Sequence, residues 1–457
     1  MERKFRAIDR LRSQVMMEVA RMAWDGTLAE ELDLLPERLK SRNAGLDDGL
    51  VEEEINLALG LSADNREDYQ SKLQRSRQEK GQRYPLINHI SSLCGSCASE
   101  CQADCPEGAI VNQEGRKQID PVKCSACGLC LSTCIHSALA DKVQFAPLLN
   151  LLRQKKNRVY ALLAPAAAGQ FGAEIGQLRT ALKLLGFHEL VEVALFADLL
   201  TILEAYEFDH KVKTDEDYMI TSCCCPVWIN TIEKNFPELL DRVVPSVSPM
   251  IAGGRVIKRI DEDALVVFIG PCAAKKKEAL EPDLKGAVDF VLTFKELEAI
   301  FQALKVAPAK LENLKKSQAS WAGLVYGRSG GVSAAISLTL EAIAPSRAIK
   351  LRSKRADGIK GCREVLQQLA SGKRKTNFIE GMGCRGGCIG GPGRIVGDLY
   401  EAAHAVDDEA EEAKIKIPIN NPMIYVLLRQ LGMNYKAPSM VNGEPLRSLL
   451  YRHNEKD

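Results

Sequence analysis

The stretch LVVFIGPCAAKKKE, Leu265–Glu278, combines a strand signal with a cysteine in one short segment. Its first five residues, Leu265–Ile269, form a continuous apolar run of the length typical of a buried strand. Cys272 follows that run within three residues. Because ligands usually lie at the carboxyl ends of the strands in an open α/β sheet, this stretch predicts a strand that delivers a cysteine to a binding site.

Strand-like and helical segments alternate on both sides of this stretch. The expected strands are Val159–Leu163, His188–Val193, Leu265–Ile269 and Val288–Thr293, and the expected helices are Gly176–Leu185, Asp198–Phe208 and Phe294–Leu304. Such an alternation predicts parallel α/β sheets for residues 146–457. Cys225, like Cys272, comes directly after a strand-like segment.

The composition narrows the class of protein. The chain has 457 residues, of which 46% are hydrophobic, enough to bury a large core in about three domains of ordinary size. Its net charge of +1 gives no basic surface for nucleic acid or for a membrane. The sequence has no apolar run of about 18 residues and no signal-peptide core at its start, so we expect a cytoplasmic protein.

Cysteine is the outlier in this composition. There are fifteen cysteines, and eight of them lie between Cys94 and Cys134. A disulfide framework suits small secreted domains with little core, whereas this chain is large and lacks an export signal. The clustering therefore favours ligation of metal ions or clusters.

The eight clustered cysteines form two runs, C-x2-C-x3-C-x3-C-P and C-x2-C-x2-C-x3-C, within residues 86–145. The second run has the bacterial ferredoxin spacing, in which the fourth cysteine of each run ligates the other cluster. Zinc is the alternative for C-x2-C pairs, but it fits this crossed pattern poorly. We expect two 4Fe–4S clusters, one held by Cys94, Cys97, Cys101 and Cys134 and the other by Cys105, Cys124, Cys127 and Cys130.

Residues 1–85 carry no cofactor motif. Apolar residues at helical spacing in Met1–Trp24 predict a helix, and the charged segment Ser62–Gln82 predicts a solvated helix or linker. We interpret this helical segment as a packing or docking element.

Three further motifs contain six of the remaining seven cysteines: TSCCCPVW (Thr221–Trp228), GPCAAKKKE (Gly270–Glu278) and EGMGCRGGCIGGPG (Glu380–Gly393). Together they resemble the three signature motifs of FeFe hydrogenases, in the same order and at similar separations. The triple cysteine resembles the branch called group B. The resemblance implies an α/β catalytic domain of two lobes of twisted sheets with helices and a cluster in the cleft. A small α+β ferredoxin-like domain and a helical N-terminal segment would precede it.

By this resemblance, four cysteines would bind the 4Fe–4S part of the active-site H-cluster: Cys225, Cys272, Cys384 and Cys388. The last would also bridge to a two-iron subsite that carries carbon monoxide, cyanide and an azadithiolate. Lys275 matches the lysine that holds a cyanide, since a fixed ammonium satisfies a buried anion. Met382 matches a methionine near the bridging ligands, and Ala164 and Pro165 match a pair on the distal side.

The resemblance also implies a proton path. Cys224 matches the thiol that exchanges protons with the azadithiolate amine. Glu204 and Glu207 match a glutamate pair that continues the path, and their helical spacing puts both on one face. Without the resemblance, two solvated helix glutamates would be the preferred interpretation.

Four positions depart from the better-known group: Cys223, Gly270, Val244 and Pro392. Gly270 stands where a methionine is common, and Val244 stands near the place of a serine in the proton path, with Ser246 close by. Cys362 lies in no motif, so we interpret it as a small buried apolar residue.

These features predict reversible interconversion of dihydrogen with protons and electrons. A ferredoxin or flavodoxin would exchange the electrons, since no G-x-G-x-x-G nucleotide fingerprint is present. Dedicated maturation proteins would be needed to supply the two-iron subsite. The alternatives are a dihydrogen or redox sensor, a hydrogenase-like assembly protein without that subsite, and a ferredoxin-only electron carrier.

Overall fold

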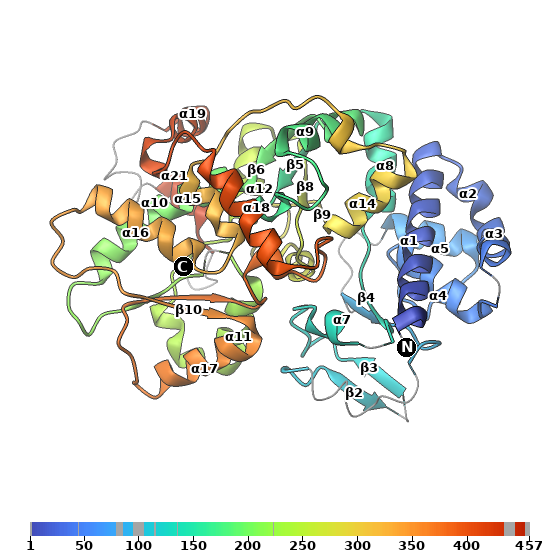
Figure 1. Ribbon diagram of the computed structural model, residues 1–457, viewed down its shortest axis with the longest axis horizontal. Helices are drawn as coiled ribbons and strands as arrows, with labels where there is room; N and C mark the ends of the chain where they lie inside the picture. The colour runs from blue at the N-terminus through green and yellow to red at the C-terminus, as the bar shows by residue number, and fades with distance from the viewer. Residues whose placement is uncertain are drawn as a thin grey trace.

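The computed structural model describes residues 2–43, 45–78, 86–94, 105–113, 116–134, 136–222, 224–433 and 444–452. Two parallel sheets form the framework of the larger part of the chain. In Figure 1 the four-stranded sheet lies in the upper half of the molecule, and the other sheet, with β10, lies at the lower left. The α/β class expected from the sequence is confirmed.

The four-stranded sheet has the order β6-β5-β8-β9, and all its strands are parallel. The strands are β5 (Val159–Leu163), β6 (Glu189–Glu192), β8 (Leu265–Ile269) and β9 (Phe290–Leu292). Leu163 pairs with Ile269, and Ile269 pairs with Leu292, so three strands end level with one another. Whatever follows these strands therefore meets at one edge of the sheet.

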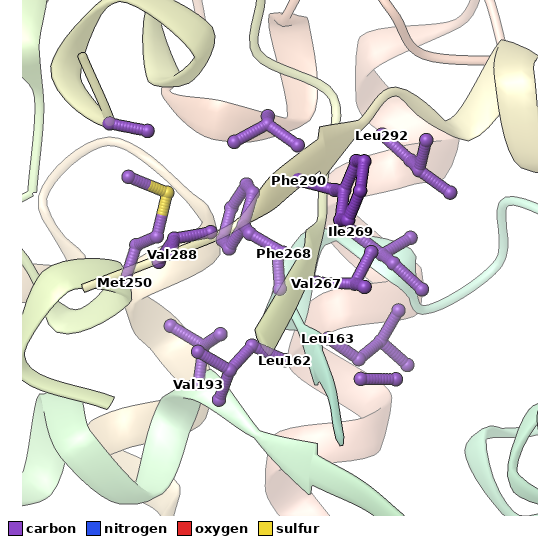
Figure 2. Close-up of a cluster of buried hydrophobic side chains, with 14 of the residues drawn as sticks. Leu162, Leu163, Val193, Met250, Val267, Phe268, Ile269, Val288, Phe290 and Leu292 are labelled. Carbon is purple, nitrogen blue, oxygen red and sulfur yellow. The ribbon is translucent and has the colours of Figure 1, made fainter. Parts of the chain in front are cut away.

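Apolar side chains from β5, β8 and β9 form a continuous buried core (Figure 2). Val267, Ile269 and Leu292 are fully buried because helices cover both faces of a parallel sheet. Phe268 and Met250 belong to this core and also line the pocket described below. The core thus fixes one wall of that pocket.

The second parallel sheet has the order β10-β11-β7. Its strands are β7 (Met219–Ile220), β10 (Ser353–Asp357) and β11 (Phe378–Met382). The central strand, β11, is buried along its whole length. β7 and β11 run side by side, and their carboxyl ends lead into two of the cysteine motifs.

Helices surround and separate the two sheets. They are α8 (Phe145–Gln154), α9 (Ile175–Leu184), α10 (Val193–Lys211), α11 (Pro226–Asn235), α12 (Pro249–Ile260), α13 (Ala274–Glu278), α14 (Phe294–Ala303), α15 (Trp321–Leu324), α16 (Gly331–Ile343), α17 (Gly358–Ala370), α18 (Leu399–Glu411), α19 (Pro422–Gln430) and α21 (Glu444–Leu450). Most residues of α10 are buried, because it packs against α12, α15 and α16. It is longer than expected, and Val193 belongs to it and not to β6.

The cysteine-dense part is small and has two antiparallel strand pairs, β1-β4 and β2-β3. Its elements are β1 (Ile87–His89), β2 (Ile110–Gln113), β3 (Arg116–Ile119), α7 (Leu129–Thr133) and β4 (Leu139–Asp141). In Figure 1 this part lies at the lower right, below the N-terminal helices. This α+β arrangement agrees with the ferredoxin-like fold expected from the sequence.

The N-terminal elements are helical: α1 (Glu2–Asp25), α2 (Leu28–Glu31), α3 (Leu35–Arg42), α4 (Asp48–Ala58) and α5 (Tyr69–Gln78). α1 packs along α8 and α14, and its apolar stripe, which includes Leu11, Val15 and Met22, is buried there. α5 is less solvated than expected, because Lys72 is buried and pairs with Glu52 at 2.9 Å. Among the described helices, none combines the length and the apolar character needed to cross a membrane.

Candidate metal-cluster site

One pocket brings together four of the cysteines predicted to bind the active-site cluster. They are Cys225, Cys272, Cys384 and Cys388. The first follows β7, the second follows β8, and the last two follow β11, so the pocket lies at the carboxyl ends of both parallel sheets. It holds about 760 Å³ of space free of atoms, counting the part open to solvent.

Local backbone features hold these thiols in place. Cys225 is the N-cap of α11, whose first residue is Pro226. The backbone N–H of Gly383 donates to the Cys225 Sγ at 3.3 Å. Gly387 has φ 91°, and a Cβ there would lie 2.5 Å from the backbone nitrogen of Ser329. Only glycine fits at position 387, because its φ is in the left-handed region and the chains approach closely.

Three of these thiols, Cys272, Cys384 and Cys388, lie in an environment that disfavours their ionisation in the absence of a cation. Burial, followed by the neighbouring sulfurs, raises the pKa of Cys272 to about 11 and that of Cys388 to about 12. The same causes raise the pKa of Cys384 well above its ordinary value. Soft thiolates select iron–sulfur clusters, and a bound cluster would deprotonate its coordinating thiols. Four convergent, partly exposed thiols that line one pocket therefore fit a cubane.

The lining of the same pocket also contains every other residue that the resemblance assigns to the cluster environment. These residues are Ala164, Pro165, Cys224, Lys275 and Met382. Lys275 Nζ lies 2.7 Å from Glu278 Oε2, and both side chains are buried. Burial alone would lower the pKa of Lys275, but the Glu278 carboxylate raises it. The pocket thus has a fixed ammonium, and Glu278 is a partner that sequence reasoning missed.

Glu204, on α10, is fully buried and accepts two hydrogen bonds. The Thr221 hydroxyl donates to Oε2 at 2.7 Å, and the Ser246 hydroxyl donates to Oε1 at 2.8 Å. The interpretation as a solvated helix glutamate is therefore wrong for this residue. The Val244 side chain has no hydroxyl, and its backbone carbonyl accepts a hydrogen bond from the Ser222 hydroxyl at 2.5 Å. The serine hydroxyl that contacts Glu204 therefore comes from Ser246.

Glu207, one turn further along α10, is nearly buried and faces two donors. The Tyr451 hydroxyl donates to Oε1 at 2.7 Å, and Lys211 Nζ lies 2.9 Å from Oε2. Burial alone would raise the pKa of Glu207, but these two donors lower it. Tyr451 also forms a β-bridge with Ser246, so the end of the described chain adjoins both glutamates.

A second pocket gathers the thiols of one predicted ferredoxin-type cluster: Cys105, Cys124, Cys127 and Cys130. Cys105 Sγ accepts from the Ala109 N–H at 3.2 Å, and Cys124 Sγ accepts from the Ala126 N–H at 3.4 Å. Backbone donors of this kind are among the features that tune iron–sulfur clusters. Burial raises the pKa of Cys127 to about 11, as in the first pocket.

The other predicted ligand set is described only in part. Cys94 and Cys134 are partly exposed, and Cys134 Sγ accepts from the Ala138 N–H at 3.3 Å. Its other predicted ligands, Cys97 and Cys101, lie outside the described residues, as does Cys223. Within the described ranges, no three His, Cys, Asp or Glu side chains gather as the ligands of a single metal ion would.

The two described pockets adjoin each other. Cys127 packs in the same apolar cluster as Cys225 and Cys272. A Cβ on Gly128 would lie 2.4 Å from Pro392 Cγ, so the proline that interrupts the glycine run of the third motif packs on the second ferredoxin-type run. Pro392 is therefore a contact between the two sites.

The structure explains the residues at two further positions, Gly270 and Cys362. A Cβ on Gly270 would lie 2.6 Å from the Phe268 ring and 3.2 Å from the Ala164 Cβ, so these side chains fill the space of the common methionine. Cys362 is buried, as expected, and its thiol donates to the Met382 carbonyl at 3.4 Å.

A family model, iron only hydrogenase large subunit, C-terminal domain, matches residues 157–392, just over half of the chain. The chain belongs to this family, whose members are iron–sulfur proteins. The match begins just before β5 and ends at Pro392, so it includes both parallel sheets and all four thiols of the first pocket.

Relatives in this family differ in function. The chain is 26% identical to iron hydrogenase 1 of Clostridium pasteurianum over 66% of its own length and 63% of that protein's. It is 23% identical to the probable cytosolic Fe-S cluster assembly factor oxy-4 of Caenorhabditis elegans, over 68% of this chain and 77% of that one. Hydrogenases and assembly factors are thus both among its relatives.

A solved structure supports the fold. A variant of the FeFe hydrogenase HydA1 from Chlamydomonas reinhardtii superposes with a TM-score of 0.52 at 23% identity. The superposition covers 65% of this chain and 94% of that one.

Proposed function

We propose that the chain is an FeFe hydrogenase of the group B type, which interconverts dihydrogen with protons and electrons. The observation that carries this proposal is the first pocket. Besides the four thiols, its lining includes the side chains expected around a two-iron subsite: Ala164, Pro165, Cys224, Lys275 and Met382.

The chain's own residues would act as follows. The four thiolates hold the cubane, and the Lys275 ammonium pairs with an anionic ligand in the pocket. When bound, the two-iron subsite supplies the metal that takes up dihydrogen and the base that receives its first proton. The Cys224 thiol would relay a proton by releasing its own toward the buried Glu204 and taking up another at Sγ.

Beyond Glu204, hydroxyl groups continue the route. The Ser246 hydroxyl donates to Glu204 at 2.8 Å and can carry a proton by releasing one as it accepts another. Glu207 then receives the proton beside Tyr451, and Lys211 marks the exit, since its side chain is 48% exposed.

Electrons would leave by the second pocket. The thiol of Cys127 packs with Cys225 and Cys272, which makes the cluster of Cys105, Cys124, Cys127 and Cys130 the nearer relay. The cluster of Cys94 and Cys134 would be the outer relay, and a ferredoxin or flavodoxin in the cytoplasm the acceptor. In this proposal residues 1–85 are a helical support, 86–145 the relay and 146–457 the catalytic domain, loaded by maturation proteins.

An assembly factor is the second candidate, because relatives of that function match a similar share of the chain. Such a protein would keep the cysteines but have no use for a buried proton route. The hydrogen bonds of Glu204 to Thr221 and Ser246 favour the enzyme. A dihydrogen sensor would share the site and differ in turnover alone.

Infrared spectroscopy of the anaerobically matured protein tests the proposal. We expect bands of metal-bound carbon monoxide and cyanide that shift under dihydrogen, together with dihydrogen turnover. Shifting bands without turnover would favour the sensor. The control is a known hydrogenase that acquires its two-iron subsite under the same maturation conditions. If this control shows the carbon monoxide and cyanide bands and our protein, with fully loaded cubanes, shows none, the proposal is overturned in favour of the assembly factor.

A further inference from the structure

Lys276, the second lysine of α13, is fully buried and takes no part in the pocket. Its ammonium lies 2.8 Å from Asp141 Oδ2 and 2.7 Å from Glu296 Oε2, and it also donates to the Lys142 carbonyl. Burial alone would lower the pKa of Lys276, but the two carboxylates raise it, so the side chain stays charged. Lys276 is therefore a paired cation in the interior.

The partners of Lys276 come from different parts of the chain. Asp141 ends β4, in the same small part as the second pocket, whereas Glu296 lies in the first turn of α14. Glu296 is itself fixed, because it accepts from the backbone N–H and the hydroxyl of Thr293 at 2.7 Å and 2.8 Å, and from the Gln144 N–H at 2.9 Å. The carboxylate of Glu296 is thus held by three donors besides Lys276, whereas Asp141 belongs to the ferredoxin-like part.

The helix that carries Lys276 connects the two pockets. α13 begins two residues after Cys272, and Lys275, next to Lys276, lines the first pocket. On the other side, Lys277 Nζ donates to the Cys124 carbonyl at 2.8 Å. Ala273 and Ala274 pack against cysteines of the second pocket. A displacement of β4 relative to α13 would therefore change the separation between the two sets of thiols.

Stability gives no sufficient reason for this ion cluster. Replacing a buried ion pair by well-packed apolar residues is often neutral or stabilising, whereas its charged geometry specifies one arrangement of the groups. Two carboxylates and a carbonyl around one ammonium fix a direction and a distance, which an apolar contact does not.

We propose that Lys276 is a positioning residue that fixes the ferredoxin-like part against α13 and so sets the separation between the relay cluster and the catalytic cubane. The inference rests on the proposed cluster ligands, but not on the two-iron subsite or on turnover. One electron at a time passes between the two clusters in the proposed function. Electron transfer falls steeply with separation, so a loosened junction would slow this step and leave chemistry at the cubane unaffected.

The test compares Lys276→Met with Lys295→Met. Lys295 is an exposed lysine on α14 beside Glu296, so its replacement makes the same change in charge and length without touching the junction. Both variants are prepared with cubanes only, without maturation proteins, and reduced with dithionite. Electron paramagnetic resonance then reports the magnetic interaction between the reduced clusters, which depends on their separation, and iron analysis reports their loading.

We expect Lys276→Met to weaken or broaden the magnetic interaction at unchanged iron content, while Lys295→Met keeps the spectrum of the original protein. In matured protein, dihydrogen–deuterium exchange should be unchanged and carrier reduction several-fold slower. An unaltered interaction in iron-loaded Lys276→Met would overturn the inference. The electron paramagnetic resonance test needs no two-iron subsite. Its result therefore stays valid even if the infrared spectrum shows no carbon monoxide or cyanide bands.

Lys276→Met leaves Glu296 buried without its cation, and this variant can fail to load iron. Asp141→Asn removes the ion pair between Lys276 and the ferredoxin-like part, keeps the Lys276–Glu296 pair and the bond to the Lys142 carbonyl, and changes a side chain that is 26% exposed. We expect it to load fully and to show the same weakened interaction. A fully loaded Asp141→Asn protein with the original interaction would contradict the positioning role.

Discussion

At the residue scale, Glu204 shows how hydroxyl donors hold a carboxyl group in the interior. Two hydroxyl groups, from Thr221 and Ser246, donate to its two oxygens. Hydroxyl groups both donate and accept, so they solvate the carboxylate and can also pass a proton. Burying such a group unpaired would cost several kcal/mol, and its neighbours offset that cost.

Replacing Glu204 by Gln should therefore block proton transfer with little change in packing. The amide keeps an acceptor oxygen but cannot carry the proton. We expect dihydrogen turnover to fall by roughly 10²-fold or more, which is the rate contribution typical of a positioned proton-transfer group. The infrared bands should keep their positions. Glu262→Gln, at an exposed glutamate, is the control and should retain full turnover. Full turnover in Glu204→Gln would exclude the route through this residue.

The sequence supported the prediction of the cysteines but not of their partners. Spacing predicted the eight ferredoxin-type cysteines because their runs are a local property of the chain, whereas Cys225, Cys272, Cys384 and Cys388 were expected from the family resemblance. Glu278, Ser246 and Tyr451 were missed or left open, because a hydrogen bond from Tyr451 to Glu207 joins segments far apart in sequence. Of these three residues, only Ser246 could be suspected from the sequence, because it lies two residues after Val244.

At the scale of elements, the turn at Gly128 forms a close contact between the two sites. Gly128 has φ 75° and is the N-cap of α7, and Pro392 lies against its Cα. A side chain at this position would meet both a left-handed backbone and the proline ring.

Gly128→Ala should lower the free energy of unfolding by about 1–3 kcal/mol through backbone strain alone, and further through the clash with Pro392. Denaturant unfolding and iron content per chain measure both effects. Adding Pro392→Gly should restore part of the loss, because it removes the clash and leaves the strain. Gly361→Ala, in α17 with no neighbour within 4 Å, should be neutral or stabilising. Equal effects of the two alanines would contradict this account.

The secondary structure was largely predictable, since a strand such as Val159–Leu163 is marked by its own apolar run. The junction of β6 and α10 was not, because Val193 is apolar in either element and the helix is buried on most sides. Periodicity gives no boundary where a helix has no solvated face.

At the scale of the whole molecule, the first pocket depends on two separate sheets. β8 belongs to one sheet and β11 to the other, and their carboxyl ends supply thiols to the same space. Strand runs predict that sheets exist, but not which strands share one, since pairing is decided by contacts across the fold. The meeting of the two sheets was therefore expected only from the family resemblance.

Removing iron should affect the two parts of the chain unequally. Residues 86–145 have little apolar core, so bound clusters would supply much of their folding free energy. The parallel sheets have extensive buried cores of their own. We expect chelation to increase amide hydrogen exchange in β1–β4 far more than in β5 and β8, as measured by mass spectrometry. Uniform protection after complete iron removal would show that the small part folds without clusters.

The order of the thiols along the chain has a consequence for biosynthesis. All predicted ligands of the proposed ferredoxin-type clusters have been translated once Cys134 leaves the ribosome, so these clusters could be inserted while the rest is still being made. The first pocket includes Cys388, and the proposed proton route includes Tyr451, near the end of the described chain. In the proposed function, the electron relay could thus be complete on a nascent chain, whereas the catalytic centre could be loaded only after synthesis is nearly finished.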